Sequence, residues 1–251
     1  MFPTRHPHPR PVARRLAIGA MGLASTSLAA VGLGACGDGD AADDVAPIPI
    51  TAAVTAAVGG STSQPAGGAL TDQLASMPIG DLSDDEREAL LYMIEEEKLA
   101  RDVYTLLADT WGTRVFSNIA DAEQTHTDAV AALLTRYGVP LPTTNGLPGV
   151  FTDPDLQLLY DQLVAQGTTS LVDALTVGAT IEEVDIADLR ARAGDDPDIQ
   201  MVFDNLERGS RNHLRAFVGQ LADRGASYTP VHISQIDFDT IVSSGTERGH
   251  P

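Results

Sequence analysis

Four apolar stripes at helical spacing, each interrupted near its middle by acidic or imidazole side chains, constrain this chain more than any other feature. Apolar residues that recur three and four positions apart mark the face of a helix that packs into a core. The clearest interruption is Glu123-Gln-Thr-His126, where a carboxylate and an imidazole three residues apart project from the same side of a helix. Buried polar groups are costly unless they are paired, so the interrupting side chains need a common partner.

Local signals place the helices between about residues 82 and 225. Ser83-Asp-Asp-Glu86 is a capping box and predicts a helix that runs to about Asp109. A second helix is expected from near Phe116 to Gly138, which Pro140 follows. Three more helices are expected, from Asp153-Pro154 to Gly167, from Thr169 or Ser170 to about Ala193, and from Asp196-Pro197 to Gly225. The sequence therefore predicts an all-α, antiparallel bundle of four long helices with one short extra helix.

The first thirty-six residues have the pattern of an export signal. Four arginines precede an apolar run from Leu16 to Leu33, which ends in Leu33-Gly-Ala-Cys36. That ending resembles a bacterial lipobox, which implies cleavage before Cys36 and lipidation of this cysteine. The alternatives are an N-terminal anchor that stays uncut, or a cysteine there by chance. Arg14-Arg15 also resembles part of a twin-arginine signal.

The remaining chain divides by composition. Residues 37–80 are rich in small and polar residues and contain no aromatic residue, which predicts a flexible tether. Residues 81–225 form the expected helical domain, and residues 226–251 form a weakly structured C-terminal tail. All 35 acidic residues but only 12 of the 16 basic ones follow Cys36, so the exported part has a formal charge of −23. This charge argues against nucleic acid and anionic lipid as partners.

A bound cation would explain the interruptions. They comprise Glu97 in the first helix, Glu123 and His126 in the second, Glu182 and Asp185 in the fourth and His213 in the last. Several ionised carboxylates in one core would each cost several kcal/mol unless protons or cations neutralised them. A pair of divalent metal ions supplies the charge and the coordination. Oxygen and imidazole ligands favour iron or manganese, and zinc less strongly.

Four segments carry a resemblance to a known family. They are Glu95-Glu-Glu-Lys-Leu-Ala-Arg-Asp-Val-Tyr104, Glu123-Gln-Thr-His126, Ile181-Glu-Glu-Val-Asp-Ile186 and Gly209-Ser-Arg-Asn-His-Leu-Arg-Ala-Phe217. Together they resemble the bacterial and archaeal ferritin-like family called domain of unknown function 2202. The resemblance implies a ferritin-like four-helix bundle related to rubrerythrin-type di-iron proteins. A shared fold does not by itself transfer an activity.

The ferritin-like pattern, carried over position by position, implies metal ligands at Glu97, Glu123, His126, Glu182 and His213. In the helix that holds Glu182, Asp185 lies one turn further along, and Glu183 competes if the helix is rotated.

The last helix departs from this pattern. Di-iron proteins have a second bridging glutamate three residues before the histidine, where this chain has Ser210. Glu207 lies one turn further back and is a less direct candidate. A single metal ion, or an asymmetric pair completed by water, is therefore an alternative to a full two-metal site.

Each candidate also has a structural interpretation. Glu97 can pair with Arg101 on a helix surface, and His213 can be a core histidine that donates to Ser210 or to a backbone carbonyl. Glu182 and Asp185 can cap or solvate the end of their helix. Tyr104 and Tyr137 are expected as core aromatics, with a role beside the metal as the minority interpretation.

Two functions from different classes follow. The first is an exported, lipid-anchored di-iron or manganese oxidoreductase of the bacterial cell envelope, on its periplasmic side or at the cell surface. Its substrate would be oxygen, peroxide or ferrous iron. The second is a catalytically silent bundle that binds metal or a partner protein. A homodimer is compatible with both, and an iron-storing cage is disfavoured by the anchor and the tether.

Overall fold

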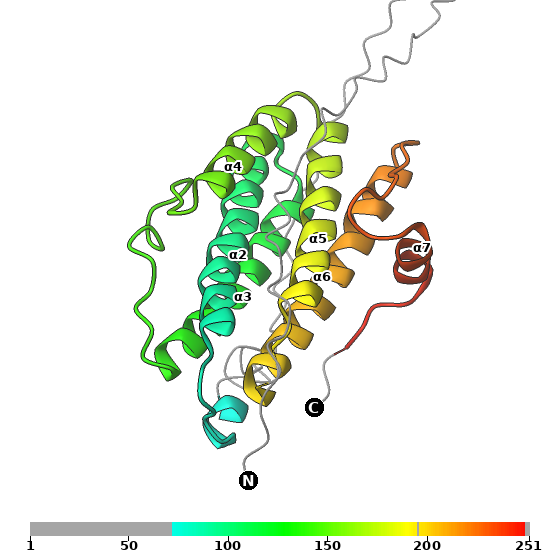
Figure 1. The fold of residues 1–251 in the computed structure, drawn as a ribbon. Coiled ribbons are helices and arrows are strands. Elements are labelled where there is room, and N and C mark those ends of the chain that lie inside the picture. The colour runs from blue at the N-terminus through cyan, green and yellow to red at the C-terminus, as the bar shows by residue number, and fades with distance from the viewer. Residues whose placement is uncertain (1–71, 195, 249–251) are drawn as a thin grey trace, which may run out of the picture. The chain divides into compact units, whose positions relative to one another are not determined.

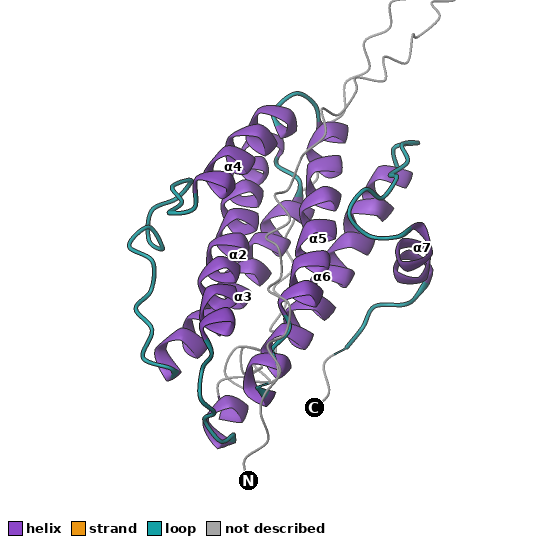
Figure 2. Ribbon diagram, in the orientation of Figure 1, coloured by secondary structure: helices purple, strands orange, loops and turns teal. Residues whose placement is uncertain are grey.

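The computed structural model describes residues 72–194 and 196–248, and within these residues every regular element is a helix (Figures 1 and 2). The helices are α2 (Asp84–Trp111), α3 (Arg114–Arg136), α4 (Pro154–Gly167), α5 (Leu171–Arg192), α6 (Pro197–Ala222) and α7 (Gln235–Ser243). The predicted all-α class is confirmed. The predicted signal and Cys36 lie outside the described residues, as does the predicted tether up to residue 71. The rest of the tether differs from its prediction, because residues 72–76 are helical and Leu74 is buried in the core.

Side-chain caps start α2, α4, α5 and α7, whereas α3 and α6 begin without one. At the start of α2, the Ser83 hydroxyl accepts a hydrogen bond from the Glu86 backbone N–H at 3.2 Å, and Glu86 Oε2 accepts from the Ser83 N–H at 3.0 Å. This is the predicted capping box. Ser170 rather than Thr169 caps α5, because its hydroxyl accepts from the Asp173 N–H at 3.1 Å. Helix α2 ends two residues later than expected, at Trp111, where Gly112 adopts a φ of 63°.

The four long helices are arranged as two hairpins. Helix α2 packs along α3 and α5 packs along α6, while α2 also contacts α5 and α3 also contacts α6. Residues 137–153 return the chain along the bundle to α4, which packs against both α2 and α5 (Figure 1). Each long helix therefore runs antiparallel to the long helices that it contacts, whereas α4 runs parallel to α2.

The core consists of two apolar clusters. One contains Tyr104, Phe116 and Phe217, and the other contains Met93, Leu133 and Phe203. In α2, α3 and α6 the chain passes from one cluster to the other across the same level of the bundle. The polar interruptions of the stripes lie at that level.

Charged residues next to the predicted ligands anchor the long connection. The Glu95 carboxylate accepts from the backbone N–H groups of Thr152 and Asp153 at 2.6 and 3.0 Å. Lys98 is fully buried, with its Nζ 2.8 Å from Asp102 Oδ2 and 4.1 Å from the centre of the Phe151 ring. These contacts hold the connection against α2.

The expectation of a weakly structured tail is wrong. Residues 235–243 form α7, which Ser234 caps, and Phe238 and Ile241 are buried. The weak alternation in the sequence did not indicate this helix, because it buries only two side chains. Glu247 pairs with Arg211 at 2.6 Å and Arg215 at 2.5 Å and fixes the chain beyond α7 to α6.

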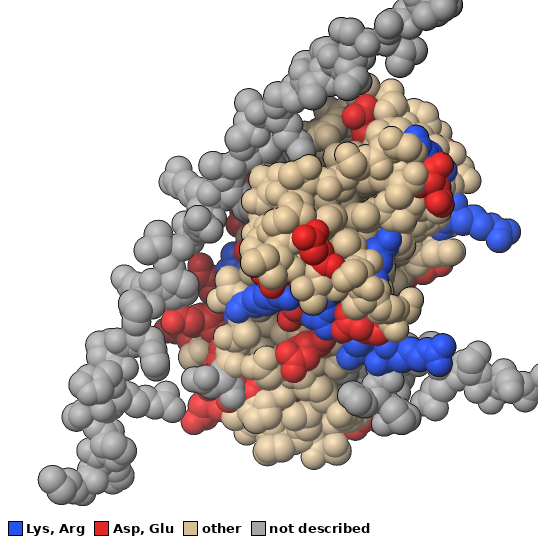
Figure 3. Space-filling model, turned by 90° about the vertical axis from the view of Figure 1, so that its right-hand side faces the viewer, with Lys and Arg blue, Asp and Glu red and all other residues tan. Residues whose placement is uncertain are grey.

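Basic and acidic side chains are interspersed on the face of the molecule that Figure 3 shows.

None of the described helices combines the length and the apolar character that crossing a bilayer requires.

Candidate metal centre

Five predicted ligands converge at the level between the two apolar clusters. Glu97, Glu123 and Glu182 are 1%, 2% and 1% exposed. The imidazoles are less enclosed, because the side chain of His126 is 13% exposed and that of His213 is 12% exposed. The four long helices thus contribute carboxylates and imidazoles to one buried cluster, as the stripe interruptions predicted.

Glu123 is at the centre of the cluster. Its Oε2 lies 2.7 Å from His126 Nδ1, and its Oε1 lies 2.8 Å from His213 Nδ1. The two rings stack with their centres 5.6 Å apart. One carboxylate therefore faces two imidazoles, with one oxygen directed at each.

A further carboxylate flanks each imidazole. Glu97 Oε2 lies 3.3 Å from His126 Nδ1, and Glu182 Oε2 lies 3.4 Å from His213 Nδ1. The cluster thus consists of two groups that share Glu123, namely Glu97, Glu123 and His126, and Glu123, Glu182 and His213. In each group the potential ligand atoms lie within 4.8 Å of one another.

Hydrogen bonds among the protein atoms do not fully satisfy this cluster. His213 Nδ1 approaches the Glu123 carboxylate closely, but its direction is not that of a hydrogen bond, and Glu97 Oε1 has no partner among the described residues. Buried polar atoms without partners are rare in folded proteins. His126 Nδ1 bonds to Glu123 and Glu97, so the cluster is satisfied in part, and the atoms left without a partner fit a cation.

In the metal-free protein, the carboxylates and imidazoles of the cluster shift one another's pKa values. Burial and the neighbouring Glu123 raise the pKa of Glu97 to about 7, although His126 opposes them. Burial alone would lower the pKa of His213, but Glu123 and Glu182 raise it to about 10. Burial would raise the pKa of Glu123, but the two imidazoles lower it well below its usual range. Without a metal ion, the histidines therefore carry the positive charge.

Tyr104 supports the Glu182 half of the cluster. Its hydroxyl donates to Glu182 Oε1 at 2.5 Å, with the Gly178 carbonyl oxygen 3.2 Å away. The Tyr104 ring packs against Phe217 and Phe116, with ring centres 5.3 and 6.4 Å apart. Tyr104 is thus both a core aromatic and a hydrogen-bond donor to a candidate ligand.

The structural interpretations of Glu97 and Glu182 are wrong. Arg101 bonds to Asp102 and Gln124 rather than to Glu97. Glu182 is buried inside α5 and does not solvate its end. For His213, Ser210 is not the partner, since the Ser210 hydroxyl donates to Asp185 and to the Leu206 carbonyl oxygen.

Two lower-priority candidates lie outside the cluster. Glu183 Oε1 accepts from the backbone N–H groups of Val231 and Ile233 at 2.6 and 2.7 Å, so it anchors the chain before α7. Glu207 pairs with Arg190 at 2.9 Å and with Arg211 at 2.5 Å. Asp185 is buried close to the cluster, and its Oδ1 has no partner.

Glu96 is a buried carboxylate that the sequence pattern did not indicate. It is 3% exposed, and neither of its oxygens has a hydrogen-bond partner among the described residues. Burial, then Asp188 and Glu97, raise its pKa well above the usual value. Glu96 lies off the apolar stripe and beside residues of α4 and α5, and helical periodicity does not encode such contacts.

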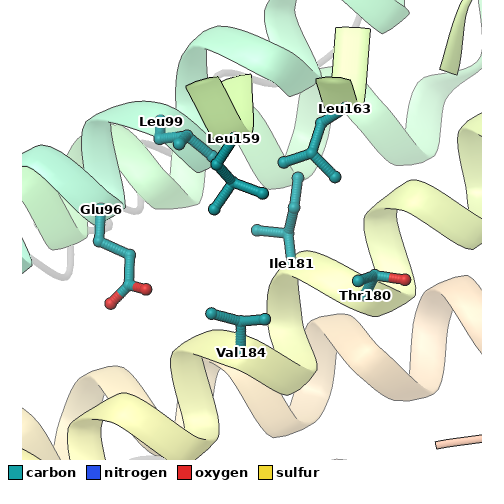
Figure 4. A pocket seen from close by; sticks show the side chains of 7 residues that line it. All are labelled: Glu96, Leu99, Leu159, Leu163, Thr180, Ile181 and Val184. Atoms are coloured by element: carbon teal, nitrogen blue, oxygen red, sulfur yellow. The ribbon is translucent and has the colours of Figure 1, made fainter. Parts of the chain in front are cut away.

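Glu96 lines a small apolar cavity between α2, α4 and α5 (Figure 4). The cavity has a volume of about 20 Å³, and its other walls are Leu99, Leu159, Leu163, Thr180, Ile181 and Val184. This volume is about that of one water molecule. None of the five converging ligands lines it.

Comparison with known proteins decides the family. The sequence pattern described as "Uncharacterized protein domain (DUF2202)" matches residues 86–245. The chain belongs to the DUF2202 family. It is also 50% identical over 182 residues to the "Uncharacterized protein MJ0754" of Methanocaldococcus jannaschii, an alignment that covers 72% of this chain and 98% of that protein.

A solved structure supports the helical fold of this DUF2202 protein. The crystal structure of hypothetical protein MJ0754 from Methanococcus jannaschii aligns with a TM-score of 0.67 at 50% identity. The alignment covers 68% of this chain and 99% of that one. The membership of DUF2202 predicted from the four quoted segments is therefore confirmed.

Proposed function

We propose that this DUF2202 protein is a ferritin-like metalloprotein that holds two divalent metal ions, iron or manganese rather than zinc, on either side of Glu123. The observation that supports this most directly is the position of the Glu123 carboxylate. Its two oxygens lie 2.7 Å from His126 Nδ1 and 2.8 Å from His213 Nδ1, and one more carboxylate lies beside each histidine. A ligand set of carboxylates and imidazoles without thiolates suits these metals.

The charges support binding of cations. Three carboxylates and two imidazoles meet in a site that is almost closed to water, where an unpaired charge costs several kcal/mol. Metal ions would neutralise the carboxylates and displace the protons from the histidines. Tyr104 would keep Glu182 oriented through its hydrogen bond of 2.5 Å.

We further propose that the centre is an oxidoreductase site for oxygen, peroxide or ferrous iron. When bound, iron or manganese would supply the redox change and an open coordination position for the oxidant. The carboxylates are the most buried ligands and the histidines are partly exposed, so a small molecule would reach the centre between α3 and α6. The two apolar clusters above and below would exclude bulk water.

Metal analysis tests the proposal. The protein is produced in medium with added iron or manganese, purified without an affinity metal column, and assayed for bound metal and for oxidation of ferrous ion. We expect stoichiometric iron or manganese, and its loss in a Glu123→Ala/His126→Ala double variant. Glu207→Gln is the control, because Glu207 pairs with arginines outside the cluster. Wild-type protein without stoichiometric transition metal would refute the proposal.

A second candidate function is a metal-binding bundle without turnover. The observation that favours it is Ser210, which stands where di-iron proteins have a bridging glutamate. Consumption of oxygen or peroxide above that of free metal distinguishes the two candidates. Metal that raises the melting temperature without any turnover would favour the silent bundle.

The location is proposed from the sequence. Lipidation of Cys36 would anchor the protein to the cell envelope. A Cys36→Ser variant is then expected to leave the membrane fraction. If that variant and the wild-type protein fractionate identically, the anchor is not at Cys36.

A further inference from the structure

Asp185 is a buried acid in α5 that the two ligand groups around Glu123 do not use. It lies one helical turn after Glu182 and is 5% exposed. Its Oδ2 accepts a hydrogen bond from the Ser210 hydroxyl, but its Oδ1 has no partner among the described residues. A carboxylate oxygen at this depth without a donor requires another explanation.

The packing of α5 against α2 places Asp185 towards Glu97. The two helices run antiparallel, and Tyr104 of α2 bonds to Glu182 of α5. Moving from Glu182 to Asp185 advances about 4.5 Å along the bundle, in the direction that leads from Tyr104 back to Glu97. Burial, and then the neighbouring carboxylates of Glu97, Glu96 and Glu123, raise the pKa of Asp185 well above its usual value.

Each of the two ligand groups contains two carboxylates and one histidine, and Asp185 belongs to neither. Iron and manganese sites in helical bundles use more donors than three. Helix α6 would supply another carboxylate if it repeated the Glu-x-x-His pattern of α3, but it has Ser210 three residues before His213. The Ser210 hydroxyl instead orients a carboxylate of the opposite helix.

We infer that Asp185 is an additional metal ligand, which binds through Oδ1 the ion held by Glu97, Glu123 and His126 while Ser210 holds Oδ2. This inference rests on the proposed metal centre. In this protein α5 supplies the carboxylate that α6 lacks. The competing explanation is that Asp185 only accepts the Ser210 hydrogen bond, in which case Ser210 or water completes the coordination.

Cobalt(II) binding to the full-length protein separates these explanations. Binding is measured by calorimetry, and the visible absorption of cobalt reports its coordination. We expect wild-type protein to bind two ions. Asp185→Asn should keep one ion at wild-type affinity and bind the other at least about tenfold more weakly, with a changed spectrum. Ser210→Ala keeps the carboxylate and should bind both ions.

The controls keep the outcomes distinct. Asp198→Asn alters a buried aspartate that is paired with Arg136 at 2.9 Å outside the cluster, and its folded fraction should bind both ions. Circular dichroism verifies folding, and if Asp185→Asn does not fold, Asp185→Ser removes the same carboxylate and is expected to weaken the same ion. Unchanged binding in Asp185→Asn, or loss of an ion in Ser210→Ala, overturns the inference but leaves the proposed function intact. Wild-type protein that binds no cobalt overturns both.

Discussion

At the scale of single residues, the main feature of this centre is that carboxylates raise the pKa values of both histidines. Glu123 and Glu182 raise the pKa of His213 to about 10, and Glu123 and Glu97 raise that of His126 well above its usual value, although burial alone would lower both. Both imidazoles are therefore charged at neutral pH without metal. A histidine that binds a cation through Nδ1 must first release the proton from that atom.

Metal affinity and the stability of the metal-free protein should respond to pH in opposite directions. Because the pKa of His213 is raised on folding, its stabilising contribution is complete below about pH 6.5 and is lost as the pH rises to about 10. Metal-free protein should thus melt at a lower temperature at pH 9 than at pH 7. Over the same range cobalt should bind more tightly, by about tenfold per pH unit for each proton released.

Calorimetry in buffers of different ionisation enthalpy measures these protons. We expect release of at least one proton per bound pair of ions. Metal binding with no proton release and no pH dependence would mean that the histidines are not ligands.

Adjacent residues of α5 have separate roles because a helix turns about 100° per residue. Glu182 faces the cluster, whereas Glu183 is buried under the chain before α7 and accepts N–H groups from residues 231–233. Glu182→Gln should therefore weaken metal binding and leave α7 protected from hydrogen exchange. Glu183→Gln should do the reverse, and the two variants are controls for each other. Loss of metal in Glu183→Gln with α7 still protected would contradict this assignment.

Helix α6 approaches α3 closely at a glycine. A Cβ atom at Gly209 would lie 2.5 Å from His126 Nε2, which is too close for any side chain. Alanine is favoured over glycine inside a helix by about 1 kcal/mol, so glycine at position 209 makes α6 less stable than alanine would. Its hydrogen atom leaves room for the His126 ring.

Gly209→Ala should accordingly displace His126 and weaken metal binding by about tenfold or more, with helix content unchanged. Gly219→Ala is the matched control in α6, because a Cβ atom there meets nothing within 4 Å. It should leave binding intact and raise stability by up to about 1 kcal/mol. Equal metal affinities for the two variants would show that the ring does not need this space.

The bundle as a whole depends on its polar layer. The two apolar clusters are continuous within themselves, but the layer between them contains acids whose charges repel. A ligand that binds only the folded state stabilises it by about 2.7 kcal/mol at a concentration one hundred times its Kd. Metal should therefore act as a third stabilising element beside the two clusters.

Removal of metal by a chelator should lower the melting temperature by about 5–10 °C, since 1 kcal/mol corresponds to about 2–4 °C in a domain of this size. Scanning calorimetry before and after chelation measures the shift, and added manganese should reverse it. The Glu123→Ala/His126→Ala variant should show no shift. An equal shift in that variant would place the stabilising metal elsewhere.

Helix boundaries and inward faces could be predicted because both depend on local chemistry. Ser83-Asp-Asp-Glu86 caps its own helix, and a period of 3.6 residues orients Glu97, Glu123 and His126 towards the core without reference to other helices. Periodicity states which side of a helix is buried but not which residues of another helix it meets. That Glu123 faces both histidines depends on the register between α3 and α6, and the burial of Glu96 beside residues of α4 and α5 depends on how those helices pack. Such contacts join residues far apart in the chain, so they form only when the helices pack.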